Sequence, residues 1–149
     1  MSSHIRPLAV CLFTNGDRIL VNEAHDPVKK LSFCRPIGGG IQFGETGTQA
    51  IERETLEELG TAIRDVRFVG TLENIFTYLG EPGHEIVLVF DAAFEDGSLY
   101  ARPFLSGRES NGDAFEAHWR DLSSFNEQLP LFPEGLASLV RSYWRERAA

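Results

Sequence analysis

The chain has 149 residues, of which 42% are hydrophobic and 24% charged, and its formal net charge is −8. This length and composition are typical of one globular domain over residues 1–149, and they exclude a disordered or fibrous chain. The acidic charge argues against nucleic acid or an anionic membrane as partner, because both need a basic patch. No apolar run could span a bilayer and the start of the chain has no signal pattern, so we expect a cytoplasmic protein.

The first part of the chain predicts strands. An apolar run over residues 8–14 is separated by Asn15-Gly16 from a second run over residues 18–21, which is the pattern of a β-hairpin. Residues 31–35 then predict a short strand, closed by a proline and opening into a loop of three glycines.

A helix follows this glycine loop. Thr46 or Thr48 offers a side-chain oxygen as the cap of its first turn, residues 49–59 favour a helix, and Gly60 supplies the stop.

The helix carries an acidic face. Glu54, Glu57 and Glu58 fall within an arc of about 100°, and like charges at this spacing oppose the helix by roughly 0.2–0.5 kcal/mol per pair. A bound cation would remove this penalty, and carboxylates suit Mg²⁺ or Mn²⁺. The alternative is a solvated surface helix in which Arg53 pairs with Glu57. The apolar residues 50–51 border the same face, so we expect the acids to line a cleft.

The second half of the chain again predicts strands. Residues 63–76 and 85–94 form two strands joined by a turn at 81–83, and the most apolar run, 85–94, is the candidate central strand. Residues 98–113 predict a long loop near the site, and residues 115–120 a short strand.

A last helix is predicted to open at Pro133-Glu134 and to pack on the sheet. Strands before, between and after two separated helices indicate an α/β layered domain. Cys11 and Cys34 lie in predicted strands, so we expect buried thiols and no disulfide.

One segment carries a family resemblance. Gly39, five residues, Glu45, seven residues, then Arg53-Glu54-x-x-Glu57-Glu58-x-Gly60 resembles the Nudix box. Thr55 and Thr61 depart from it, since the family usually has aliphatic residues there, and we expect looser helix packing as a result. Arg35-Pro36 before the box and the pattern at residues 73–85 after it are similar to one bacterial Nudix subgroup whose substrates are poorly defined.

The resemblance implies both fold and chemistry. Nudix domains are α/β/α sandwiches with a mixed β-sheet, and they hydrolyse the pyrophosphate of a nucleoside diphosphate linked to another moiety. The expected ligands of Mg²⁺ or Mn²⁺ are Glu54, Glu57, Glu58 and the backbone carbonyl of Gly39. Arg53 is expected to be structural, with Glu45 as the partner that orients the acids.

The sequence leaves more than one candidate for the general base. The family takes it from the helix, here Glu54 or Glu57, or from a later segment. Glu116 is the candidate from outside the helix, because a glutamate stands three residues before a strand tryptophan in many Nudix chains. Glu109 or Asp113 could replace it, and a plain surface role for Glu116 is the competing interpretation.

The candidate substrate contacts are few. We expect Arg35 to contact phosphate, and Tyr78 or Phe76 to stack on a nucleobase, although aromatic residues on a strand are more often part of the core. His84 would touch the substrate or, with Glu85, brace its loop.

The expected function is hydrolysis of a small nucleotide-derived substrate, such as a dinucleoside polyphosphate, a nucleotide sugar or a nucleoside triphosphate. The alternative is a catalytically silent Nudix module that binds a nucleotide or a partner as a sensor. The intact acid set favours the enzyme. The sequence leaves a homodimer open.

Overall fold

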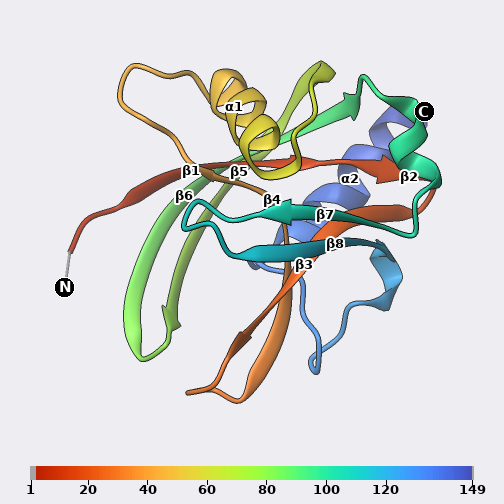
Figure 1. The fold of residues 1–149 in the computed structure, drawn as a ribbon. Coiled ribbons are helices and arrows are strands. Elements are labelled where there is room, and N and C mark those ends of the chain that lie inside the picture. The colour runs from red at the N-terminus through yellow and green to blue at the C-terminus, as the bar shows by residue number, and fades with distance from the viewer. Residues whose placement is uncertain (1–2, 149) are drawn as a thin grey trace.

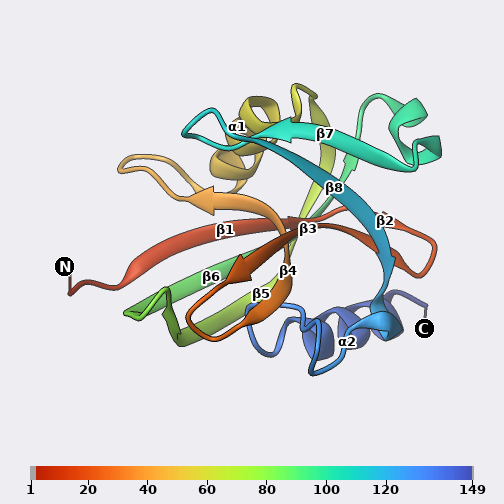
Figure 2. The ribbon, with the colours of Figure 1, turned by 60° about the horizontal axis from the view of Figure 1, so that its bottom comes forward.

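The computed structural model describes residues 3–148 as a mixed sheet between two helices (Figure 1). The strand order is β5-β6-β1-β4-β3-β8-β7, and β2 pairs with β3. Figure 2 shows α1 on one side of the strands and α2 on the other, which confirms the expected α/β/α sandwich. The elements are β1 (Arg6–Leu12), β2 (Thr14–Asn15), β3 (Arg18–Asp26), β4 (Leu31–Gly40), α1 (Gly47–Leu59), β5 (Ile63–Tyr78), β6 (Glu81–Phe94), β7 (Phe104–Arg108), β8 (Ala114–Asp121) and α2 (Leu136–Ala148), with short 3-10 helices η1 (Gly97–Ala101) and η2 (Leu122–Ser124).

Two apolar cores hold the helices on the sheet. Ala50 and Ile51 of α1 are fully buried against one face, and Leu136 and Val140 of α2 are fully buried against the other. Alternate residues of β1 enter the two cores, because successive strand side chains point to opposite faces. The two cysteines are buried free thiols, as expected.

Local signals position α1 as predicted. Thr46 is the N-cap, and it forms a capping box with Gln49. Gly60 ends the helix in a left-handed conformation at φ 68°. Thr55, one of the two departures from the box pattern, is buried, and its Oγ1 has no hydrogen-bond partner among the described residues.

The glycine segment is a strand, so the prediction of a loop there was wrong. β4 continues through its proline, and Gly38, Gly39 and Gly40 pair with β1. A Cβ on Gly38 would collide with the carbonyl oxygen of Ala9, so glycine lets the two strands approach. The predicted hairpin is also shorter than expected. In the first predicted strand and its turn, only the β2 residues pair with β3, whereas β1 pairs with β4 and β6.

Three later boundaries differ from the predictions. The turn between β5 and β6 lies at Leu79-Gly80, where both residues have positive φ, and not at 81–83. The expected loop at 98–113 contains η1 and the strand β7, which pairs with β8. The last helix begins at Leu136 instead of at Pro133. The prediction of a strand at 85–94 is confirmed, since β6 lies between β5 and β1.

The cleft opens where the sheet divides. The first part of β4 pairs with β3, whereas its glycine end pairs with β1. The β3–β4 and β5–β6 hairpins extend in the same direction (Figure 1), and their tips are joined by the Leu79 backbone N–H, which donates to Asp26 Oδ2 at 3.2 Å. Together with α1 they border a cleft of about 560 Å³. Within residues 3–148, no helix is long and apolar enough to cross a membrane.

Candidate active site

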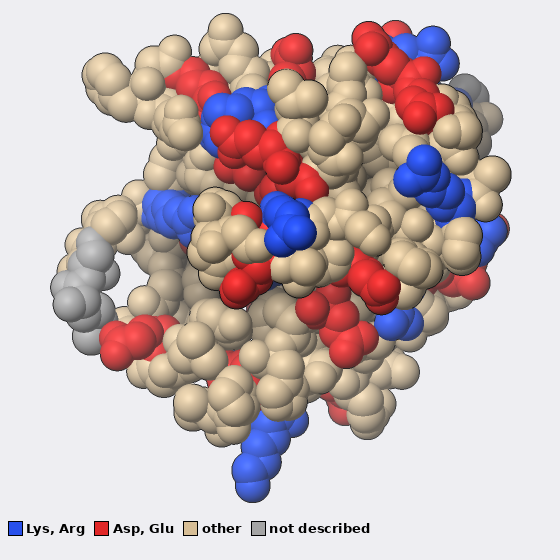
Figure 3. All heavy atoms as spheres, in the orientation of Figure 1, with Lys and Arg blue, Asp and Glu red and all other residues tan. Residues whose placement is uncertain are grey.

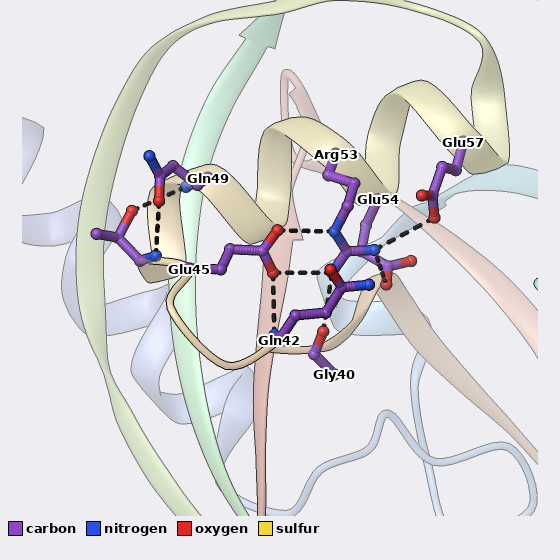
Figure 4. A network of polar contacts seen from close by, with 8 residues as sticks. Gly40, Gln42, Glu45, Gln49, Arg53, Glu54 and Glu57 are labelled. Carbon is purple, nitrogen blue, oxygen red and sulfur yellow. Dashed lines mark hydrogen bonds and ion pairs between the residues drawn. The ribbon is translucent and has the colours of Figure 1, made fainter.

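Arg53 is the centre of a polar network that fixes the start of α1 (Figure 4). Its Nε lies 2.7 Å from Glu45 Oε2 and its Nη2 lies 2.9 Å from Glu45 Oε1, which is the expected pair. Nη2 also donates to the Gly40 carbonyl at 3.0 Å, while Nη1 reaches Glu54 at 3.0 Å and Glu57 at 3.2 Å. The segment between β4 and the helix is therefore fastened at both ends.

This network perturbs the titration of Glu45. Hydrogen bonds from Arg53, and then from the Gln42 backbone N–H, lower the pKa of Glu45 to about 2. The same contact raises the pKa of Arg53 above its usual value. Both effects favour the charged forms, so the Glu45–Arg53 ion pair persists across the physiological pH range.

Glu54 lies directly over the glycine end of β4. A Cβ on Gly39 would stand 2.6–2.9 Å from the carboxyl atoms of Glu54, so only glycine permits this approach. The Gly39 backbone and the Glu54 carboxylate thus border the same part of the cleft.

Glu58 completes an acidic pair with Glu54. Burial, a hydrogen bond to Glu54 and the charges of Glu54 and Glu109 together raise the pKa of Glu58 well above its usual range. Carboxylates that share a site disfavour double ionisation, so the neutral form of Glu58 is favoured beside Glu54. Figure 3 shows acidic and basic side chains gathered on the face that carries α1.

Glu57, the third glutamate of the acidic face, lies apart from Glu54 and Glu58. The Glu57 side chain is 55% exposed, is turned toward Arg53 and does not line the cleft. Within residues 3–148, no three His, Cys, Asp or Glu side chains are grouped closely enough to hold a metal ion as they stand. The donor chemistry of Glu54, Glu58 and the Gly39 carbonyl nevertheless fits a hard dication, because all are oxygen atoms and the crowded carboxylates need positive charge.

A residue from the β7–β8 connection approaches these acids. Glu109 lines the cleft with Glu54 and Glu58, and its Oε1 lies 3.8 Å from Arg35 Nη2. Asn22 of β3 donates to the same oxygen at 3.5 Å. Asn22 is buried and its Oδ1 has no partner among the described residues. Sequence reasoning missed Asn22, although a polar residue that ends an apolar run was a usable signal.

The structure does not bring every candidate to the cleft. Glu116 lies on β8 between Phe115 and Ala117, which pack toward α1, so its side chain points to the other face. There it is 56% exposed, and its Oε1 lies 3.4 Å from His118 Nε2. Asp113 and His84 are also absent from the cleft lining, whereas Arg35, Phe76 and Tyr78 belong to it.

The sequence matches the model of the NUDIX domain over residues 4–142. This chain belongs to the Nudix family. The match extends well beyond the box on both sides and includes most of the described chain. The family assignment agrees with the geometry, in which the box residues form the capped, arginine-fastened helix beside the cleft.

Curated relatives include proteins named NAD-capped RNA hydrolase NudC. The protein from Mycobacterium tuberculosis is 29% identical over 147 residues, covering 92% of this chain and 43% of its own length. The protein from Pseudomonas syringae is 27% identical over 144 residues, covering 97% of this chain and 46% of its own. The chain thus spans less than half the length of these relatives.

Solved structures share the fold. A MutT NUDIX hydrolase from Burkholderia pseudomallei aligns with a TM-score of 0.65 at 20% identity, over 93% of this chain and 98% of that one. A MutT protein from Methanosarcina mazei aligns with a TM-score of 0.65 at 17% identity, over 100% and 99% of the two chains. At these identities the likeness establishes the architecture and leaves the substrate to be argued from the site.

Proposed function

We propose that this Nudix hydrolase cleaves the pyrophosphate linkage of a nucleoside diphosphate joined to another moiety, with Mg²⁺ or Mn²⁺ as cofactor. The observation that carries this proposal is the placement of Glu54 over Gly39, with Glu58 and Glu109 in the same cleft. Crowded oxygen donors of this kind favour a divalent cation and, with it, a multiply charged phosphate ester.

Glu54, Glu58 and the Gly39 carbonyl would hold the metal, and Glu57 would join them after leaving Arg53. The bound cation would neutralise charge on the pyrophosphate and lower the pKa of the attacking water. Arg53 positions the acids through Glu45 and the Gly40 carbonyl, so it is a positioning residue.

Glu109 is the general base that the geometry supports best. It lies in the cleft beside Glu58, and the hydrogen bond from Asn22 holds one of its oxygens. Glu109 would take a proton from water as the water oxygen bonds to phosphorus and the bridging P–O bond breaks. Arg35, near Glu109, would bind a phosphate oxygen of the substrate.

The substrate class is a small pyrophosphate-linked nucleotide. Relatives of this chain are named NAD-capped RNA hydrolase, so dinucleotide pyrophosphates such as NAD are candidate substrates. Dinucleoside polyphosphates, nucleotide sugars and nucleoside triphosphates are the other candidates. The net charge of −8 favours the small molecule over a capped RNA. Tyr78 would contact the part of the substrate that lies toward the hairpin tips.

A substrate panel tests the proposal. Purified protein is incubated with each nucleotide class and Mg²⁺ or Mn²⁺, and the products are separated by chromatography. We expect metal-dependent release of a nucleoside monophosphate from at least one class. A folded protein that cleaves no member with either metal would contradict the proposal and favour the silent binding module.

A further inference from the structure

The β5–β6 hairpin carries a polar pair that the hydrolytic machinery does not use. Asn74 and Glu85 are direct cross-strand partners, so their Cβ atoms stand about 4.5–5.5 Å apart on the same face of the sheet. Both line the cleft. The Glu85 side chain is only 16% exposed, and its nearest cation, Arg6 Nη1, is 3.9 Å away.

Glu85 has unused capacity to accept hydrogen bonds. A carboxylate offers about four acceptor sites. Asn74 forms a hydrogen bond with the Glu85 carboxylate, whereas Arg6 and Arg35 lower its pKa through their charge alone. Burial works against its charged form and raises its pKa. A partly buried carboxylate with free acceptor sites in a cleft is suited to a ligand that presents hydroxyl donors.

The spacing along the sheet fits a nucleoside diphosphate. Gly40 pairs with Leu8, Leu8 pairs with Val87, and Glu85 lies two residues before Val87. Two strand spacings of about 4.8 Å and two residues of about 3.3 Å put the Glu85 backbone roughly 12 Å from that of Gly40. A pyrophosphate held at the acidic end of the cleft can therefore carry its ribose at this pair.

An aromatic ring lies beside the polar pair. Phe76 follows Asn74 on the same face of β5, and its cross-strand partner is Gly83. A Cβ on Gly83 would collide with the Phe76 ring, so the ring lies across the glycine backbone. Phe76 also lines the cleft, about 6.6 Å along the strand from Asn74. A ring supported on one side by backbone is a platform on which a nucleobase can stack.

We propose that Asn74 and Glu85 bind the ribose hydroxyls of the substrate and that Phe76 stacks on its base. The enzyme is therefore selective for ribonucleotides. Carboxylates recognise ribose hydroxyls elsewhere by the same chemistry. This inference rests on the proposed function, since the acidic end of the cleft is taken to hold the pyrophosphate.

Calorimetric binding of ADP and of 2′,3′-dideoxy-ADP in the presence of Mg²⁺ tests the inference without turnover. Wild-type protein should bind ADP at least about 10-fold more tightly than its dideoxy analogue, the effect of losing hydrogen bonds to a charged acceptor. Glu85→Gln should reduce this ratio to within about 3-fold, because a neutral amide oxygen is a weaker acceptor. Phe76→Leu should weaken both ligands by roughly 5-fold or more and leave their ratio unchanged.

Glu73→Gln is the matched control, because Glu73 is exposed on the same hairpin, adjoins Asn74 and does not line the cleft. It should bind both ligands as wild type does, and the melting temperature of each variant confirms folding. Equal affinity of wild type for ADP and its dideoxy analogue, or no binding of either, overturns the inference. If the protein discriminates between ADP and its dideoxy analogue but hydrolyses no substrate, the ribose subsite is upheld and the proposed function is contradicted. If it hydrolyses a substrate but does not discriminate between the two ligands, the proposed function is upheld and the ribose subsite is contradicted.

Discussion

Arg53 holds both carboxylate oxygens of Glu45, with Nε 2.7 Å from Oε2 and Nη2 2.9 Å from Oε1. A two-pronged contact of this kind fixes orientation as well as distance. Since Arg53 also binds the Gly40 carbonyl, the pair connects the end of β4 to the middle of α1. The position of Glu54 over Gly39 depends on this connection.

The pair makes stability depend on pH in acid. The pKa of Glu45 is about 2 in the folded protein against an ordinary value of 4.5, so the folded state favours the ionised form. The stabilisation is fully present above about pH 4.5 and is lost as the pH falls through about 2. In denaturant unfolding, Glu45→Gln should be less stable than wild type at pH 7, and the gap should shrink as the pH falls from 4.5 toward 2. A gap of constant size over this range would refute the linkage, and Glu52→Gln, on the exposed side of α1, is the control.

Removing the carboxylate of Glu58 or of Glu57 should abolish turnover without unfolding the chain. Glu58→Gln keeps the shape of the side chain but removes a carboxylate that we propose to bind metal, and Glu57→Gln is expected to act in the same way. We expect kcat to fall by at least about 10²-fold in each. Far-ultraviolet circular dichroism and melting temperature should stay near wild type, because relief of repulsion offsets lost contacts. Wild-type kcat in both variants with Mg²⁺ as the only metal would contradict the assignment of these residues.

Metal should stabilise the folded protein. Binding to the folded state alone adds about 2.7 kcal/mol to the free energy of unfolding when the ligand is at 100 times its Kd. We expect Mg²⁺ or Mn²⁺ to raise the melting temperature of wild type measured by scanning calorimetry. In Glu54→Gln this rise should be lost or greatly reduced, whereas Glu52→Gln should retain it. Absence of any rise in wild type at millimolar metal would count against the site.

The choice of general base can be tested with two glutamates from neighbouring segments. Glu109→Gln should lower kcat by roughly 10²–10⁴-fold and remove or shift the acidic limb of the pH–rate profile, with little change in KM. Glu116→Gln should leave kcat and the pH–rate profile unchanged, because Glu116 points away from the cleft. Rescue of the Glu109 variant by excess Mg²⁺ would instead mark Glu109 as a ligand. The reverse pattern in the two variants would restore Glu116 as the base.

Local chemistry made α1 and its charges predictable. A threonine cap, a helix-favouring segment and a glycine stop act within a few residues of each other, so the helix bounds agree closely with the expectation. The spacing of Glu54 and Glu58 on one face follows from the helical repeat alone. The Glu45–Arg53 pair was accessible through the family resemblance, which extends over a continuous segment.

Strand pairing, by contrast, was decided by tertiary structure. Gly38–Gly40 looked like a loop because glycine is a weak strand former, yet β1 lies alongside and pairs with them. Glu116 and Glu109 could not be ranked from the sequence, because a shift of one residue in β8 would move Glu116 to the other face. The burial of its neighbours fixes that register.

The family, the helix and the acids that the helix carries can be read from the sequence, since they depend on contacts between residues close in the chain. Only the tertiary structure decided that Glu109 and Asn22 join those acids and that Asn74 faces Glu85 across a hairpin. The physical reason is that non-local strand register and the path of a connecting loop are set by core packing over many residues, and no short stretch of sequence encodes them.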